Sequence, residues 1–207
     1  MTSPQSDNPS PKAGEVCLLS TTRQRYFHAP VEIYSTGLVS EVIPLLEKIN
    51  ARVHDEGLYA AGYLAYESAA AFDEALTTHV DEISPTPLLW FGLYGDCDET
   101  LVDIPPSSSS TPLDWTPGVS KDEFDASIAR IREHIAAGDT YQVNYTFPLH
   151  TEFSGDAYAW FRSLCATQRG DYCAYINTGI QIIMSISPEL FFTLDGTELR
   201  TKPMKGT

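Results

Sequence analysis

Two short clusters near the end of the sequence hold side chains that could break and form covalent bonds. Lys205 stands in Pro203-Met204-Lys205-Gly206-Thr207. A lysine there could bind an anion or, if desolvated, act as an amine nucleophile, while Gly206 and Thr207 could hold a carboxylate. Glu189 follows a proline and stands between apolar runs, and a carboxyl group desolvated in this way would suit a general acid.

A third cluster, Gly138-Asp139-Thr140-Tyr141-Gln142-Val143-Asn144, could bind a polar small molecule. It leads into a stretch where Gln142, Asn144 and Thr146 alternate with apolar residues, which places uncharged hydrogen-bonding groups on one face. Each cluster by itself also has an ordinary explanation: a helix–strand junction, a glutamate in a surface turn, and a basic chain end. The nucleotide-binding, hydrolase and metalloprotease signatures are missing, and the five histidines lack ligand spacing, so we expect no metal site on them.

The spacing of apolar residues predicts the helices and strands that must position these clusters. Ser120 and Glu123 form a capping box that begins a helix, and Gly138 ends it. A strand is predicted over Tyr141–His150, and a second helix near Asp156–Ala166. Strands are then predicted over Tyr172–Asn177, Ile180–Ile186, Leu190–Leu194 and, after the Asp195-Gly196 turn, Glu198–Pro203.

The first hundred residues contain the remaining predicted elements. Strands are expected at Val16–Leu19, Leu58–Tyr66 and Leu88–Tyr94, and a helix over Leu38–Val53 that either starts near Pro44 or is kinked there and stops by Gly57. Because runs of neighbouring strands alternate with helices and no βαβ repetition is visible, we predict an α+β fold with antiparallel sheets. Pro and Ser dominate 103–118, which predicts a linker between a region 1–102 and a region 119–207.

Charge and composition exclude several classes of function. The chain has 207 residues, 13 Lys and Arg against 28 Asp and Glu, and a net charge of −15, so we expect neither nucleic-acid binding nor a polybasic membrane anchor. Residues 1–118 hold 5 basic and 17 acidic residues, whereas residues 119–207 hold 8 and 11, so an anionic substrate fits the second part better. The polar start and the four unpatterned cysteines favour a cytoplasmic protein with reduced thiols.

Taken together and in this order, the three clusters resemble the chorismate-utilising enzymes. Gly62-Tyr63-Leu64-Ala65-Tyr66-Glu67 is similar to a motif in the N-terminal region of two groups of this family, anthranilate synthase component I and aminodeoxychorismate synthase component I. The resemblance runs from about Val16 to the last residue. It implies antiparallel sheets packed face to face with flanking helices, as in anthranilate synthase component I.

At two positions the sequence resembles the aminodeoxychorismate synthases more than the other members of the family. Isochorismate-forming members carry a lysine where this sequence has Gln142, and anthranilate synthases typically carry an alanine where it has Lys205. The resemblance implies that Lys205 is the nucleophile toward chorismate and Glu189 the general acid and base, with Gln142, Gly206 and Thr207 binding substrate. It implies a reaction of chorismate with ammonia, which a glutamine amidotransferase subunit supplies.

The family's chains continue for about as many residues again, and the resemblance places the Mg²⁺ ligands in that second half. We therefore expect this sequence to be an N-terminal portion that is inactive by itself. The alternatives are a portion of anthranilate synthase component I, or a non-catalytic module that binds an amidotransferase.

The sequence departs from the family at two elements. Feedback-inhibited anthranilate synthases bind tryptophan through an L-L-E-S element and an N-P-S-x-Y element. The corresponding residues here are Leu18-Leu19-Ser20-Thr21, which lacks the glutamate, and Asn177-Thr178-Gly179-Ile180, which lacks the proline and the aromatic residue. We therefore expect no tight tryptophan site.

Overall fold

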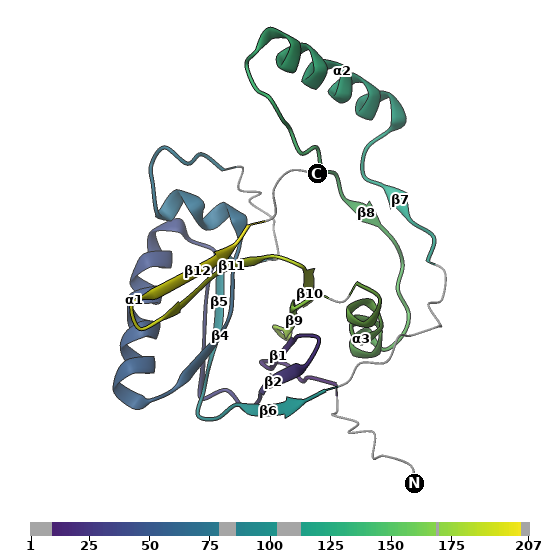
Figure 1. Ribbon diagram of the computed structural model, residues 1–207. Coiled ribbons are helices and arrows are strands. Elements are labelled where there is room, and N and C mark those ends of the chain that lie inside the picture. The colour runs from purple at the N-terminus through teal and green to yellow at the C-terminus, as the bar shows by residue number, and fades with distance from the viewer. Residues whose placement is uncertain (1–9, 79–85, 103–112, 169, 204–207) are drawn as a thin grey trace. The chain divides into compact units, whose positions relative to one another are not determined.

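The computed structural model describes residues 10–78, 86–102, 113–168 and 170–203 (Figure 1). The chain divides into two compact units, the first made of residues 1–108 and 156–207 and the second of residues 109–155. The domain division expected from the sequence, with a linker at 103–118, stays a prediction, and residues 103–112 lie outside the described part.

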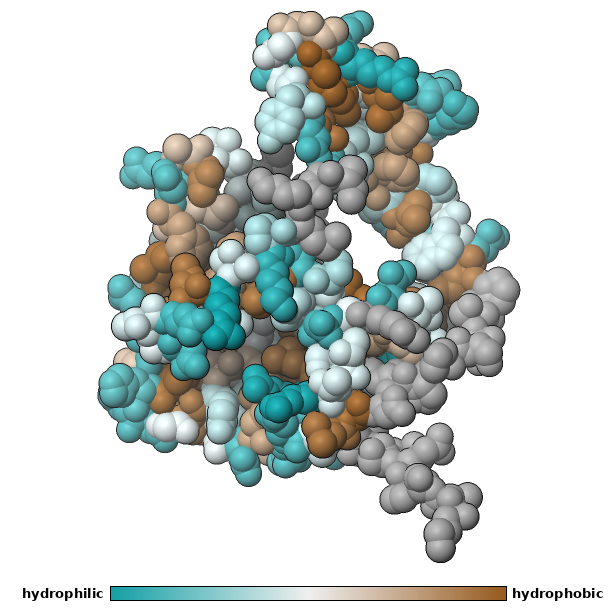
Figure 2. All heavy atoms as spheres, viewed as in Figure 1, coloured by the Kyte–Doolittle hydropathy of each residue, from teal (hydrophilic) through white to brown (hydrophobic). Residues whose placement is uncertain are grey.

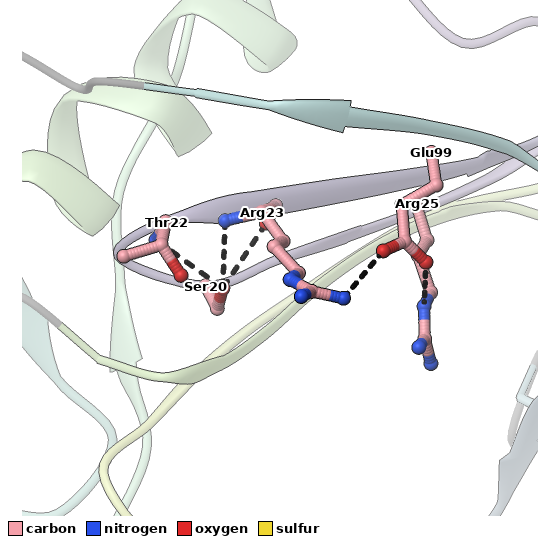
Figure 3. Close-up of polar contacts among 5 residues, drawn as sticks. All are labelled: Ser20, Thr22, Arg23, Arg25 and Glu99. Carbon is pink, nitrogen blue, oxygen red and sulfur yellow. Dashed lines mark hydrogen bonds and ion pairs between the residues drawn. The ribbon is translucent and has the colours of Figure 1, made fainter.

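The first unit contains a five-stranded antiparallel sheet in the order β10-β9-β1-β2-β6. Its strands are β1 (Val16–Leu19), β2 (Arg23–Phe27), β6 (Asp98–Leu101), β9 (Tyr172–Asn177) and β10 (Ile182–Ser187). Strand β1 pairs with β2 on one side and with β9 on the other, so residues from both ends of the sequence meet in one sheet. At the β6 edge, the Glu99 carboxylate accepts hydrogen bonds from Arg23 and Arg25 of β2, at 2.7 and 3.0 Å (Figure 3).

A three-stranded antiparallel sheet of order β3-β5-β4 forms the second layer of this unit. It contains β3 (Glu32–Thr36), β4 (Tyr59–Leu64) and β5 (Leu89–Tyr94) and carries the helix α1 (Val39–Glu56) and the 3₁₀ helix η1 (Tyr66–Ala71). Helix α1 begins before Pro44, which lies inside it, and ends at Gly57, whose φ of 66° is the left-handed cap that glycine favours.

Alternate residues along the strands form the core of the first unit. Val16, Phe27 and Ile176 of the five-stranded sheet form one buried cluster with Trp90 and Tyr94 of β5, so the two sheets pack face to face. The opposite faces are covered by helices. Helix α3 (Ala157–Gln168) packs on the five-stranded sheet, and α1 packs on the other, as Figure 1 shows on the right and left of the strands.

This arrangement confirms the α+β fold with face-to-face antiparallel sheets and flanking helices. Most strands and helices lie within a few residues of their predicted ranges. Strands β2, β3, β6 and β7 (Thr116–Pro117) and the helix η1 were not predicted. In β2, β3 and β6 polar residues hide the period-two pattern, and the four residues of β6 are all exposed. The described cysteines are free, and Cys17, Cys165 and Cys173 are buried; burial raises the pKa of the Cys17 thiol to about 11.

The first unit ends in a hairpin of β11 (Leu190–Asp195) and β12 (Glu198–Lys202), which is a sheet of its own. Phe191, Leu194 and Leu199 are 86%, 64% and 62% exposed. An isolated two-stranded hairpin is marginally stable in water, so apolar side chains of this kind usually pack against a further layer. Among the described residues, no such layer covers them.

The second unit is helix α2 (Lys121–Ala137) with two short paired strands, β7 (Thr116–Pro117) and β8 (Leu149–His150). The predicted capping box is present, with the Ser120 hydroxyl accepting from the Glu123 amide and the Glu123 carboxylate accepting from the Ser120 amide. No residue of α2 is buried, and Figure 2 shows brown, apolar residues on the surface over this helix, at the top of the view.

The strand predicted over Tyr141–His150 is wrong except for its last two residues. Tyr145 and Phe147 do face one side, where their ring centroids lie 5.7 and 5.8 Å from that of Phe124 in α2. The alternation of apolar and polar residues in this segment therefore reflects the packing of its aromatic rings on helix α2. The backbone finds a strand partner only at Thr116 and Pro117, and a strand needs a partner to exist.

None of the helices in the described part of the chain has the length and apolar composition required to span a membrane.

Candidate active site

Glu189 lies in the tight connection between β10 and β11 in the first unit. The Ser187 hydroxyl accepts a hydrogen bond from the Glu189 amide at 3.1 Å and donates one to the Glu189 carbonyl oxygen at 3.2 Å. Pro188 fixes φ between them, so the Ser187-Pro188-Glu189 sequence forms a locally closed turn. This turn sets the backbone position from which the glutamate side chain projects.

The expected desolvation of Glu189 by its apolar neighbours is not present in the described structure. Glu189 is exposed, and so are Phe191 and Phe192 just beyond it. The neighbours are apolar in sequence, but they belong to the hairpin β11–β12, which has no packed layer over it among the described residues. These rings are therefore close to Glu189 along the chain, but they do not bury its carboxyl group.

The register of the hairpin brings the segment that leads to Lys205 to the same place. Leu190, directly after Glu189, pairs with Lys202, and paired strands lie about 4.8 Å apart. The described chain ends one residue later at Pro203, which begins Pro203-Met204-Lys205-Gly206-Thr207. Lys205, Gly206 and Thr207 lie outside the described residues, but the chain enters their segment beside the turn that holds Glu189.

Gln142 lies in the second unit, a few residues after the end of α2. Gly138, with φ of 83°, ends the helix, and the Asp139 amide donates to the carbonyl oxygen of His134 at 3.0 Å. A side-chain contact of 2.8 Å between His134 Nδ1 and Asp139 Oδ2 closes the same turn. The Thr140 hydroxyl then donates to the carbonyl oxygen of Gln142 at 3.1 Å, and the Gln142 side chain is exposed.

Of the three sequence clusters, the structure describes the Glu189 turn and the Gln142 segment, and only Pro203 of the third cluster. Glu189 and the start of the Lys205 segment share one hairpin, and Gln142 belongs to the other unit. Among the residues that the structure describes, no three His, Cys, Asp or Glu side chains form a group able to hold a metal ion.

Gly170 is a positioning residue that the sequence analysis did not identify. A Cβ atom there would lie 2.9 Å from the carbonyl oxygen of Ser187 and 3.1 Å from Cys173 Sγ. Only glycine therefore lets the segment before β9 lie against the start of the Glu189 turn. A glycine directly ahead of an apolar strand was the available signal, since it often marks close backbone approach.

Comparison with known proteins places this chain in a family. The chorismate binding enzyme family matches residues 23–207, and the chain belongs to this family. The chain is 32% identical over 94 residues to aminodeoxychorismate synthase component 1 of Escherichia coli (strain K12), which covers 45% of this chain and 21% of that protein. It is 26% identical over 164 residues to the protein of the same name from Bacillus subtilis (strain 168), covering 70% of this chain and 33% of the relative.

The anthranilate synthases are similar as well. Anthranilate synthase component 1 of Streptomyces coelicolor is 32% identical over 108 residues, covering 49% of this chain and 21% of that protein. The crystal structure of anthranilate synthase component I from Streptococcus pneumoniae TIGR4 matches with a TM-score of 0.68 at 16% identity. That match covers 94% of this chain and 55% of the other, so this chain spans about half the length of the solved structure. At this identity the likeness shows the fold alone.

Proposed function

We propose that this chain is the N-terminal portion of an aminodeoxychorismate synthase component I. The enzyme would convert chorismate and ammonia to 4-amino-4-deoxychorismate for p-aminobenzoate and folate synthesis. The observation that carries the proposal is Lys205, a lysine where anthranilate synthases typically have alanine. The names of the relatives in Escherichia coli and Bacillus subtilis support the same choice.

The proposed chemistry gives each residue one task. The neutral amine of Lys205 forms a bond to C2 of chorismate while the C4 hydroxyl leaves, and Glu189 donates the proton with which that hydroxyl departs as water. Ammonia then forms a bond at C4 as the bond between Lys205 and C2 breaks. An ammonium group cannot attack, so Lys205 must lose its proton first. The hairpin register supports the pairing, because it starts the Lys205 segment beside the Glu189 turn.

The other assignments in this proposal are binding roles. Gly206 and Thr207 would hold a carboxylate of chorismate through a backbone amide and a hydroxyl. Gln142 would offer an uncharged amide on the side from which ammonia approaches, where a lysine base would instead activate water. Magnesium, by the same proposal, would be bound by residues that correspond to the unmatched part of the relatives.

Anthranilate synthase component I is the second candidate, favoured by the Streptomyces relative and by the fold match. It would release pyruvate and anthranilate instead of 4-amino-4-deoxychorismate. The third candidate is a non-catalytic module that binds an amidotransferase. It would co-purify with that subunit without binding chorismate.

Product analysis distinguishes these candidates. The protein expressed from its complete reading frame is incubated with chorismate, an ammonium salt and Mg²⁺, and its products are separated by chromatography. We expect 4-amino-4-deoxychorismate without pyruvate, and a loss of at least about 100-fold in Lys205→Ala, because the variant lacks the nucleophile. Lys202→Ala, which changes an exposed lysine three residues earlier, is the matched control and should retain activity.

Two results would contradict the proposal: anthranilate with pyruvate as products, or full turnover by Lys205→Ala. The 207-residue chain alone is expected to show no turnover. By this proposal the magnesium ligands correspond to the unmatched part of the relatives, so the chain alone would lack charges that stabilise the transition state. Turnover by this chain would show that the portion is sufficient.

A further inference from the structure

A loop in the first unit exposes large apolar side chains. It covers residues 66–78, namely η1 and the segment that follows it, and we call it the 66–78 loop. Tyr66 is 85% exposed, Phe72 53% and Leu76 48%. It directly follows β4, which is an edge of the three-stranded sheet. This part of the unit is at the upper left in Figures 1 and 2.

Hydrogen bonds within the loop hold the shape of its backbone. The Ser68 hydroxyl and amide both donate to the carbonyl oxygen of Ala65, at 2.6 and 3.0 Å. The Thr78 hydroxyl donates to the carbonyl oxygen of Glu67 at 3.2 Å, which returns the end of the loop to its beginning. The apolar residues near both ends of the loop are thereby brought to one region of the surface.

The charged residues of the 66–78 loop are all acidic. Asp73 and Glu74 are exposed on it, and Glu67 is half-buried at its start. The sequence contains no lysine or arginine between Arg52 and Lys121. Helix α1, which packs next to η1, does not compensate: Arg52 is bound to Glu32 and Glu56, and the Lys48 ammonium lies over the Tyr34 ring. Among the described residues, no salt bridge involves Asp73 or Glu74.

We propose that the 66–78 loop is a docking surface for a separate protein subunit whose facing surface is apolar at its centre and basic at its rim. A second copy of this chain fits poorly, because it would bring like charges together. Nucleic acid and anionic membranes are repelled for the same reason. If the proposed function holds, the subunit is the glutamine amidotransferase that supplies ammonia. A central aromatic anchor within a charged rim is the usual anatomy of such interfaces.

The test is a calorimetric titration of the complete protein with the purified glutamine amidotransferase of the same organism. We expect Tyr66→Ala to weaken binding at least about 10-fold, since aromatic anchors carry most interface energy. The double charge reversal Asp73→Lys with Glu74→Lys should weaken it as well, and it should remove most of the salt dependence of the wild-type affinity. The matched control is Leu101→Ala, which removes an equally exposed apolar side chain, 83% exposed, on β6.

Each outcome decides the proposal. Equal affinity of wild type and variants, or no binding by the wild type, would overturn it. A dimer of the protein that dissociates in Tyr66→Ala would show that a second copy covers the loop, and would overturn it too. Circular dichroism checks that the variants are folded. Amination of chorismate with free ammonium needs no amidotransferase, so that assay tests the proposed function separately and should be unchanged in Tyr66→Ala.

Discussion

Tyr94 joins three parts of the first unit through one buried side chain. Its ring lies against Gly92, where a Cβ atom would come within 2.2 Å of the tyrosine oxygen. Its hydroxyl donates to the carbonyl oxygen of Gly14 at 2.7 Å, and the Gly14 amide donates to Asn177 of β9 at 2.7 Å. Burial raises the pKa of Tyr94, so the hydroxyl keeps its proton over the physiological range. At the scale of single residues, stability thus depends on buried polar atoms that have partners.

The substitution Tyr94→Phe tests this contact. It removes the donor and leaves a buried carbonyl oxygen without it, so we expect the free energy of unfolding to fall by about 1–3 kcal/mol. Urea denaturation followed by fluorescence measures the change. Tyr141→Phe, at a side chain that is 91% exposed, should have almost no effect. Equal stability of both variants would show that water replaces the lost donor at Gly14.

The Glu99 carboxylate makes stability depend on pH at the edge of the five-stranded sheet (Figure 3). The hydrogen bond from Arg25, with the charges of Arg25 and Arg23, lowers its pKa from the ordinary value of 4.5. The stabilisation is therefore fully present above that value and is lost as the pH falls through the lowered one. We expect Glu99→Gln to be less stable than wild type at pH 7 and equally stable below the lowered pKa.

Thermal melts of both proteins between pH 2 and 8 measure this difference. All three side chains are exposed, so 1 M NaCl should reduce it. Thr100→Ala on the same strand is the control, because it changes no charge. A difference between wild type and Glu99→Gln that persists at the lowest pH would contradict an ionic origin.

Among the elements, the turn between β10 and β11 depends on close packing from a neighbouring loop. Ser187 closes the turn by hydrogen bonds, and Gly170 lies against the Ser187 carbonyl oxygen from the segment before β9. The strand pairing of β9 with β10 fixes both ends of this contact, since Tyr172 pairs with Ser187. The position of Glu189 is therefore set by an element that precedes it by almost twenty residues.

Gly170→Ala should displace this turn. The added methyl group must push against backbone and a buried sulfur atom, so we expect a loss of about 1–3 kcal/mol in the free energy of unfolding. Hydrogen exchange should rise at the amide of Glu189, whose bond to Ser187 would be strained. Gly37→Ala is the matched control, because a Cβ atom there meets nothing within 4 Å. Unchanged hydrogen exchange at the Glu189 amide in Gly170→Ala would show that the turn does not depend on Gly170.

At the scale of the whole molecule, the two segments that we predicted to correspond to the tryptophan-binding elements of feedback-inhibited anthranilate synthases each close a turn. The Ser20 hydroxyl accepts from the amides of Thr22 and Arg23 and donates to the Arg23 carbonyl oxygen between β1 and β2 (Figure 3). The Thr178 hydroxyl accepts from the Ile180 and Gln181 amides and donates to the Gln181 carbonyl oxygen between β9 and β10. Both hydroxyl groups are thus engaged within their own turns.

We therefore predict that the protein shows no saturable binding of tryptophan in isothermal titration calorimetry. A tryptophan-sensitive anthranilate synthase component 1, titrated under the same conditions, is the positive control. Saturable heat with a one-to-one stoichiometry would contradict the prediction. It would also show that a tryptophan site forms without the glutamate, proline and aromatic residue of those elements.

The sequence alone determined the fold class and most of the elements, because their signals are local. The capping box at Ser120 and Glu123, the glycine stops at Gly57 and Gly138, and the alternating residues of β9 are formed by neighbours within a few positions. The motifs around Gln142, Glu189 and Lys205 also pointed to the chorismate binding family that the comparison confirms. Local backbone chemistry does not depend on partners far along the chain.

The tertiary structure alone decided what depends on distant partners. It showed that β1 and β9 share a sheet, that residues 141–148 form no strand for want of a partner, and that the apolar flanks of Glu189 leave it exposed. It also placed Gly170 against Ser187 and, through the hairpin register, paired Lys202 with Leu190 directly after Glu189. Burial and strand pairing are properties of surfaces that meet in space, and a pattern in one segment cannot state which surface it will meet.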